Sequence, residues 1–523
     1  MRWLLAALAW GVGVPALIGA DWIRVNSPNF ELYTTSSERE ARATLDIFEQ
    51  ARDFFLRVKS TALAARLPVT LVGFGDAKDY RAYSLKSFTP AYFVADEQRD
   101  YIVMSDLGAD RTRAAIHEYV HLLVRDSGFA LPVWLNEGMA DVYSTFAAQD
   151  GKIMVGSIPR DRNYALTHEK WMRLPALVAV GLNSPEYNEQ ERAGIFYGQS
   201  WLLAHMLMLG DGYAAKFPMF LAEVSASGSS QNAFSSLYGK TLAEVERDMS
   251  AYFRQSTIGG AVYRGELQKV DIGPARPSTD LETALTLATL TALLGRTGEA
   301  SDRLEKLAGA HPDDPEVEQA LAYLDWRRGN LDRALGRFEQ ALTHGAGGWK
   351  IYWDYARLSA LGGREREPRL AMVRKALELK PDLTEARLML GQELYGMGRY
   401  AEALAELRQI PNIDPPHATS LYVTMAYLSA QLSQPSEARR YAEEARKYAR
   451  TPSQTASVDR LLEDLEVRAA PSACASTRCG RSRAAHTPAP RVSAPGSPAA
   501  MIERRFLRPG RESGLRHGIR FRA

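Results

Sequence analysis

The spacing of apolar residues predicts a small mixed sheet with a helix in the first part of the chain. Residues 22–34 alternate like a pair of strands, and residues 38–58 repeat apolar side chains at helical spacing. Residues 67–74 form the short apolar run that is typical of a buried strand. Residues 91–94 and 101–104 flank a polar turn and therefore predict a hairpin. With the helical patterns that follow, an α+β domain is expected.

One later helical segment is apolar around most of its circumference, which predicts that it is buried. Residues 114–124 are apolar except at His117, Glu118 and His121. An ordinary amphipathic helix with two exposed or core histidines is the alternative. Because unpaired charged groups are costly to bury, however, these three side chains need a partner, and a metal ion would supply it.

A second helix is predicted at residues 133–146, after a turn that follows the first. Packed antiparallel to the first, it would bring Glu137 to the two histidines. Asp141 lies one turn beyond Glu137 on the same face, where it can accept a hydrogen bond from the ring of His117. Asn136 is a candidate for a similar supporting role. A solvated helix position is the alternative for Asp141.

These residue types at these spacings are those of a catalytic zinc site. Two histidines four residues apart leave one face of a helix, one above the other. A catalytic zinc ion takes three protein ligands, here predicted as His117, His121 and Glu137, and keeps its fourth position for water. Glu118 would lie beside that water and take its proton. The predicted cofactor is Zn²⁺, and the predicted reaction is hydrolysis of a peptide bond.

The motif His117-Glu118-x-x-His121, followed by Trp134-Leu135-Asn136-Glu137-Gly138-x-Ala140, resembles the gluzincin metallopeptidases. It is most similar to the small peptidase MA-like domains that are often fused to helical repeats. The resemblance implies that the two histidines and Glu137 bind zinc, that Glu118 is the general base, and that Asp141 supports a ligand. It also implies that substrate lies along the sheet edge at residues 92–94. Only fifteen residues separate His121 from Glu137, fewer than in the large aminopeptidases and thermolysins, so an unusual substrate is expected.

A hydrogen-bond donor for the oxyanion of the transition state is also expected. Residues 195–209 read as a long apolar helix that resembles the downstream helix of the gluzincins, where a tyrosine points at the site. The resemblance makes Tyr197 the candidate. Packing at the head of the helix is the alternative for Tyr197. His205, two turns later, is expected to be a hydrogen-bonded core histidine.

A repeat occupies the second half of the chain. Small residues recur at Ala300, Ala334, Ala403 and Ala438. Arg369 stands at the equivalent position of one further repeat, so the five positions are spaced by 34 or 35 residues. This pattern resembles the tetratricopeptide family over residues 281–451, as about five repeats that would form an all-α solenoid. The stack would present a concave groove to an extended peptide or partner protein, with a spacer or stabilising cap as the alternative. Residues 256–280 are predicted as a linker, in which a strand pair at residues 261–270 could close the first domain or belong to the connection. Residues 452–467 are predicted as a capping helix.

Residues 1–20 are predicted to be a signal peptide. A charged start, an apolar stretch of 15 residues and a small-residue site ending at Ala20 predict cleavage there and a periplasmic or secreted protein. Membrane contact is expected only if this segment stays uncleaved. The mature domain would begin at residue 21 and extend to 255. Both cysteines of the chain, Cys474 and Cys479, lie near its end, so the predicted domains contain no disulfide.

The tail, residues 468–523, differs in composition from the rest of the chain. It carries twelve arginines, two glutamates and no lysine, whereas the whole chain has a net charge of +2. Low hydrophobicity with charge of one sign predicts disorder. No nucleic-acid partner is expected, because no recognition motif accompanies the basic residues.

The sequence therefore predicts an exported zinc metallopeptidase that acts on peptides or proteins and uses its repeats to recruit substrate or partner. An endopeptidase is favoured, because no acidic motif for binding a free amine precedes His117. One alternative is an exported tetratricopeptide scaffold whose peptidase-like domain only binds. Another is a zinc hydrolase that acts on something other than peptides.

Overall fold

The computed structural model describes residues 21–59, 67–85, 89–255, 258–410, 415–449 and 452–469. The predicted signal segment and the tail beyond residue 469 lie outside the described residues. The chain divides into two compact units, Met1–Leu307 and Ala308–Ala523. Within the described ranges, none of the helices combines the length and apolar character that a membrane crossing requires.

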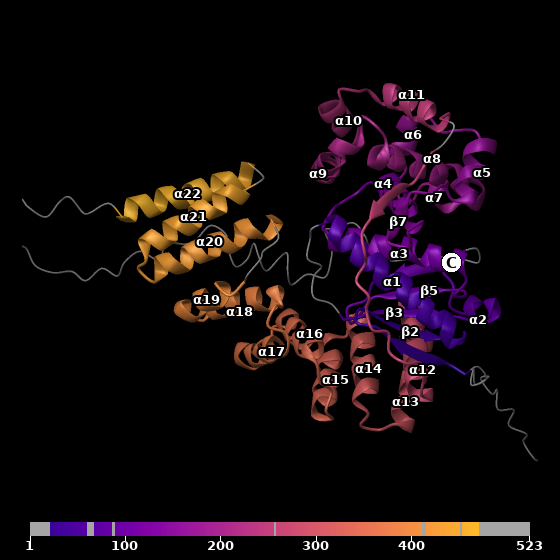
Figure 1. The fold of residues 1–523 in the computed structure, drawn as a ribbon. Helices are drawn as coiled ribbons and strands as arrows, with labels where there is room; N and C mark the ends of the chain where they lie inside the picture. Colours follow the sequence, from indigo (N-terminus) through magenta and orange to yellow (C-terminus); the bar gives the residue numbers. More distant parts are fainter. Residues whose placement is uncertain are drawn as a thin grey trace, which may run out of the picture. The chain divides into compact units, whose positions relative to one another are not determined.

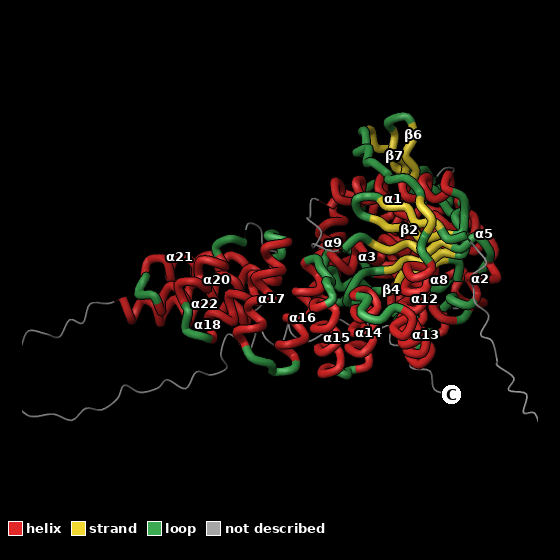
Figure 2. The backbone as a smooth tube through the Cα atoms, turned by 90° about the horizontal axis from the view of Figure 1, so that it is seen from below, coloured by secondary structure: helices red, strands yellow, loops and turns green. Residues whose placement is uncertain are grey.

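A six-stranded mixed sheet forms the centre of the first unit, in the order β4-β5-β3-β2-β1-β9 (Figure 2). The strands β2, β3 and β5 run parallel, and β4 pairs antiparallel with β5, which confirms the predicted hairpin. Every residue of β2, β3 and β5 is buried, as expected for parallel strands covered on both faces. The strand bounds are β1 (Ile23–Asn26), β2 (Phe30–Thr34), β3 (Val69–Gly73), β4 (Ala91–Val94), β5 (Tyr101–Met104) and β9 (Arg276–Pro277).

Helices from distant parts of the sequence cover the sheet. On one face, α1 (Glu38–Lys59) and α3 (Ala109–Asp126) share an apolar core with β2 and β5, in which the rings of Phe30, Phe48 and Tyr119 meet edge to face or tilted. The short helix α2 (Ala77–Arg81) and α12 (Asp280–Leu293) share a second core with side chains of β3, β4 and β5.

The part of the first unit that follows the sheet is mostly helical. Figure 1 shows α9, α10 and α11 grouped near α6 and α8. Their core contains large aromatic side chains that are fully buried, among them Trp134, Trp201, Phe196, Phe220 and Phe234. The bounds are α4 (Val133–Ser144), α5 (Arg160–His168), α6 (Leu174–Val178), α7 (Pro185–Asn188), α8 (Gln190–Leu209), α9 (Phe217–Ser227), α10 (Ser230–Tyr238) and α11 (Leu242–Phe253).

The segment expected to be a linker, residues 256–280, contributes two strands to the first unit. β8 (Ala261–Arg264) pairs with β7 (Lys152–Val155), which also pairs with β6 (Ala147–Gln149), and β9 pairs with β1. At the end of the segment, Glu282 in the first turn of α12 forms ion pairs with Arg24 and Arg276. These contacts fix the start of α12 against the sheet, so the segment is folded and belongs to this unit.

Helices alone build the described part of the second unit. Consecutive helices pack as pairs, and Phe338, Tyr323 and Trp326 form an aromatic contact within one pair. Gly329 and Gly398 end first helices of pairs with φ of +81° and +74°, a conformation that glycine adopts without strain. The bounds are α13 (Thr297–Ala310, across the unit boundary), α14 (Pro315–Arg328), α15 (Leu331–Thr343), α16 (Trp349–Leu361), α17 (Arg366–Leu379), α18 (Thr384–Gly396), α19 (Tyr400–Leu407), α20 (Pro415–Gln431), α21 (Pro435–Tyr448) and α22 (Pro452–Ala469).

Candidate metal centre

Two consecutive helices position the predicted metal ligands. Helix α3 carries His117, Glu118 and His121, and it ends before Gly128, whose φ of +71° turns the chain. Helix α4 then begins after Pro132 and carries Glu137 on its second turn. The apolar side chains of α3 from Ala115 to Val124 are buried, as its sequence predicted.

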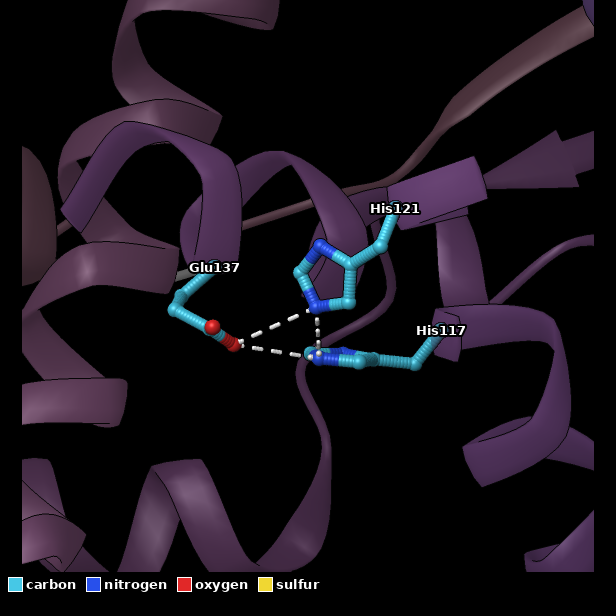
Figure 3. Close-up of side chains that lie close together, drawn as sticks. All are labelled: His117, His121 and Glu137. Atoms are coloured by element: carbon cyan, nitrogen blue, oxygen red, sulfur yellow. Dashed lines mark hydrogen bonds and ion pairs between the residues drawn. The ribbon is translucent and has the colours of Figure 1, made fainter. Parts of the chain in front are cut away.

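The three predicted ligand atoms converge on one point (Figure 3). The Nε2 atoms of His117 and His121 lie 3.1 Å apart. Oε2 of Glu137 lies 3.2 Å from Nε2 of His117 and 3.6 Å from Nε2 of His121. Figure 3 shows the two imidazoles of α3 and the carboxylate of α4 pointing toward one another. The fold therefore brings these three side chains together, as the two-helix prediction required.

The spacing of these atoms fits a zinc ion. Zinc binds histidine nitrogen and carboxylate oxygen at about 2.0–2.2 Å in a tetrahedral arrangement, which places neighbouring ligand atoms about 3.3–3.5 Å apart. The three observed separations, 3.1, 3.2 and 3.6 Å, lie around that value. The donor set of two imidazoles and one carboxylate is also one that zinc prefers in catalytic sites. His117, His121 and Glu137 are therefore the residues that would hold the ion.

Asp141 supports the first histidine from behind. Nδ1 of His117 lies 2.9 Å from Oδ1 of Asp141, which is buried. A proton on Nδ1 makes this a donated hydrogen bond and leaves the lone pair of Nε2 directed at the point where the ligand atoms converge. Asp141 also accepts hydrogen bonds from Arg162 on α5, at 2.6 Å from Nε and 3.3 Å from Nη2. Nothing in the sequence spacing had indicated Arg162.

The charges of the cluster stabilise one another. Burial opposes ionisation of Glu137, but His121 and the hydrogen bonds from both imidazoles hold the pKa of its carboxyl well below the usual range. Burial likewise lowers the pKa of His117, yet Asp141 and Glu137 outweigh it and raise the pKa to about 10. A divalent cation would also balance the charge of these carboxylates, and its binding would displace protons from the imidazoles.

Glu118 leaves the same helix toward the sheet edge. Its Oε2 accepts a hydrogen bond, 3.1 Å long, from the backbone N–H of Phe93 on β4. Burial raises the pKa of Glu118, against the opposing influence of His121 and His117. A carboxylate with a raised pKa beside a metal site is suited to accept and return a proton. The strand β4 is an edge of the sheet, so its outer backbone groups lie beside Glu118.

Two tyrosines approach the cluster, and the sequence pointed to only one. The hydroxyl of Tyr187, on the short helix α7, donates a 3.0 Å hydrogen bond to Oε1 of Glu137. Tyr197, the predicted oxyanion donor, lies on α8 with its ring 6.1 Å from that of Tyr187 and beneath the guanidinium of Arg162. Tyr187 follows a loop and has no motif spacing to Glu137, so no sequence signal could have found it.

Asn136 and His205 are the two remaining residues that the sequence singled out. Oδ1 of Asn136 is buried and has no hydrogen-bond partner among the described residues, so the predicted supporting contact of Asn136 is not seen. His205 is fully buried, and its Nδ1 lies 2.9 Å from the hydroxyl of Tyr252. This hydrogen bond agrees with the expected core role for His205, and burial lowers the pKa of its imidazole to about 4.

A charged hollow of about 770 Å³ lies on the second unit, where α14 and α15 meet. Both signs of charge line it, and Arg337 there forms ion pairs with Glu318 and Asp325. The lining residues are Asp313, Glu318, Arg333, Gly336, Arg337, Glu339, Gln340, Thr343 and His344.

Comparison with known proteins identifies the repeats. Residues 370–422 match the family model of the tetratricopeptide repeat, which confirms the predicted repeat in this region. No curated protein sequence matches the chain. Tetratricopeptide repeats stack into surfaces that bind peptides or proteins.

Three of the solved structures that are similar to the chain each align with about a third of it. YrrB, described as a tetratricopeptide protein with an unusual peptide-binding site, is 18% identical over 34% of this chain and 90% of its own, with a TM-score of 0.31. The MamA protein is 16% identical over 32% of this chain and 90% of its own, with a TM-score of 0.29. PilF of Pseudomonas aeruginosa is 19% identical over 36% of this chain and 85% of its own, with a TM-score of 0.28.

Proposed function

We propose that the first unit is a gluzincin-like zinc metallopeptidase, exported from the cytoplasm, and that the tetratricopeptide repeats recruit its substrate or a partner protein. The observation that carries this proposal is the convergence of His117, His121 and Glu137, with separations of 3.1–3.6 Å that match the corners of a zinc tetrahedron. A bound zinc ion would polarise the scissile carbonyl and lower the pKa of a water molecule at its open position.

Glu118 is the general base of this proposal. It stands one residue after a predicted ligand, close enough to both imidazoles for them to influence its pKa, and its carboxylate accepts a hydrogen bond from the backbone of Phe93. Glu118 takes a proton from the attacking water and delivers it to the leaving amine. The helix sets the direction of Glu118, because successive side chains of α3 are about 100° apart around the helix axis.

The edge strand β4 is suited to hold an extended substrate. Antiparallel pairing with β5 leaves the other side of β4 as the sheet edge, and Phe93 in the middle of β4 contacts Glu118. A peptide added to this edge would run past the general base. Tyr197, with Tyr187 beside it, would complete the site by donating a hydrogen bond to the oxyanion.

A comparison of the wild type with Glu118→Gln tests the proposed activity. Both proteins are expected to bind one equivalent of zinc, measured by elemental analysis, because Glu118 is not a ligand. Wild type should cleave an unstructured protein such as casein, and Glu118→Gln should be slower by about 10²-fold or more. Equal zinc and equal trace hydrolysis in both would contradict a peptidase and leave the scaffold hypothesis, in which the repeats bind partners that the full chain does not cut.

A further inference from the structure

Arg162 joins two parts of the proposed site that come from different helices. It is the third residue of α5, and its side chain is only 17% exposed. Nε and Nη2 both contact the carboxylate of Asp141, at 2.6 and 3.3 Å. The face of the same guanidinium lies over the ring of Tyr197, 4.8 Å from its centroid. Nη1 donates a hydrogen bond to Asp161 at 2.8 Å, so all three nitrogens of the group have a carboxylate partner.

The fold is built to allow this contact. Helix α5 packs directly on α8 at Gly198, next to Tyr197. A Cβ at position 198 would lie 3.3 Å from Cγ of Leu166 and 3.4 Å from the carbonyl oxygen of Arg162 itself. The first turn of α5 therefore lies against α8 at this glycine, and this contact places Arg162 between Tyr197 and Asp141.

The contact with Asp141 controls how that carboxylate meets His117. Asp141 is 1% exposed, and a buried carboxylate with a single partner can rotate or be left partly unsatisfied at considerable cost. Two donors from Arg162 fix the plane of the carboxylate, and Oδ1 then faces Nδ1 of His117. The partners behind a ligating histidine set the orientation of its ring and the metal affinity.

We propose that Arg162 is a positioning residue of the metal centre, which holds Asp141 behind His117 with one edge and Tyr197 with its face. The proposal rests on the proposed zinc site. A lysine cannot do the same, because an ammonium group lacks the planar fork that binds a carboxylate at two points and covers an aromatic ring.

Zinc affinity of the full chain tests this role, measured by competition with a chromophoric chelator. Arg162→Gln is expected to weaken zinc binding about 10- to 100-fold, the range found for partners behind metal ligands. The zinc affinity of Arg162→Lys should lie between that of Arg162→Gln and that of the wild type. If Arg162→Gln fails to fold, the affinity of Arg162→Lys tests the role instead. Arg160→Gln, exposed on the same helix, removes the same charge and should leave the affinity unchanged.

A double-mutant cycle with Asp141→Asn shows whether Arg162 acts through Asp141. Non-additive effects are expected, with Arg162→Gln adding little to Asp141→Asn. At saturating zinc the kcat of Arg162→Gln should stay below that of the wild type, because Tyr197 has lost its support. The proposed role of Arg162 would be overturned, and the zinc site would stand, in either of two cases. Folded Arg162→Gln would have the zinc affinity and kcat of the wild type, or the losses in the cycle would be fully additive. A wild type that binds no zinc would instead defeat the proposed function and this role with it.

Discussion

The hydroxyl of Tyr187 donates a hydrogen bond to Oε1 of Glu137, and Oε2 of the same carboxylate faces the two histidines. One oxygen of the third ligand is thus occupied by a phenol, and the other is directed at the point where the ligand atoms converge. Because a carboxylate can bind zinc through one oxygen or two, this hydrogen bond would favour binding of a zinc ion through Oε2 alone.

Loss of the Tyr187 hydroxyl is therefore expected to affect the metal site itself. Tyr187→Phe should weaken zinc binding about 10-fold, because Glu137 is no longer fixed in one orientation. Chelator competition measures this, and Tyr164→Phe, a substitution on an exposed tyrosine of α5, serves as the control. If Tyr187→Phe binds zinc like the wild type but loses kcat, Tyr187 acts on the substrate rather than on Glu137.

The residues on long periodic helices could be predicted from the sequence, and those on short helices that follow loops could not. His117, His121, Glu137 and Asp141 lie on α3 and α4, where helical spacing places side chains on a known face. Arg162 and Tyr187 lie near the starts of short helices after loops, and their distance to the site depends on tertiary packing. No local pattern encodes that distance.

The same distinction applies to the fold. The hairpin of β4 and β5 followed from two short apolar runs around a polar turn. The segment 256–280 read as a linker because of its glycines and prolines, yet β8 and β9 complete two sheets there. β8 falls within residues 261–270, where a strand pair was possible, whereas β9 has two residues, too few to show the alternation by which longer strands are recognised.

Close packing of α4 on α8 makes a prediction at Gly138, next to Glu137. A Cβ at this position would lie 2.2 Å from the carbonyl oxygen of Ser200 and 2.7 Å from Cβ of Ala204. Gly138→Ala must push the two helices apart and is expected to cost about 1–3 kcal/mol of unfolding free energy in urea. Gly298→Ala, in the open first turn of α13, has no such neighbour and should be neutral or slightly stabilising. Equal stability of both variants would contradict the close approach.

Zinc should stabilise the folded chain, because the three ligands lie together only when α3 and α4 are packed. At free zinc about 100 times the dissociation constant, the expected gain is about 2.7 kcal/mol, and a chelator should abolish it. Glu137→Gln should lose most of this gain, whereas Glu266→Gln, at an exposed position, should keep it. Differential scanning calorimetry with and without zinc measures the shift in Tm. A wild-type Tm that does not change when zinc is added would contradict a metal site.

Acid should destabilise the first unit through His205. Burial lowers the pKa of this imidazole to about 4, whereas in the unfolded chain it is about 6.5. Between these values the unfolded state binds more protons than the folded state, so stability falls as the pH drops from about 6.5 to about 4. The contribution of His205 over this window is about 3 kcal/mol. His205→Gln removes the titrating group, so its urea unfolding free energy should fall less steeply with acid than that of the wild type. Parallel curves for the two proteins would show that His205 is not held neutral in the core.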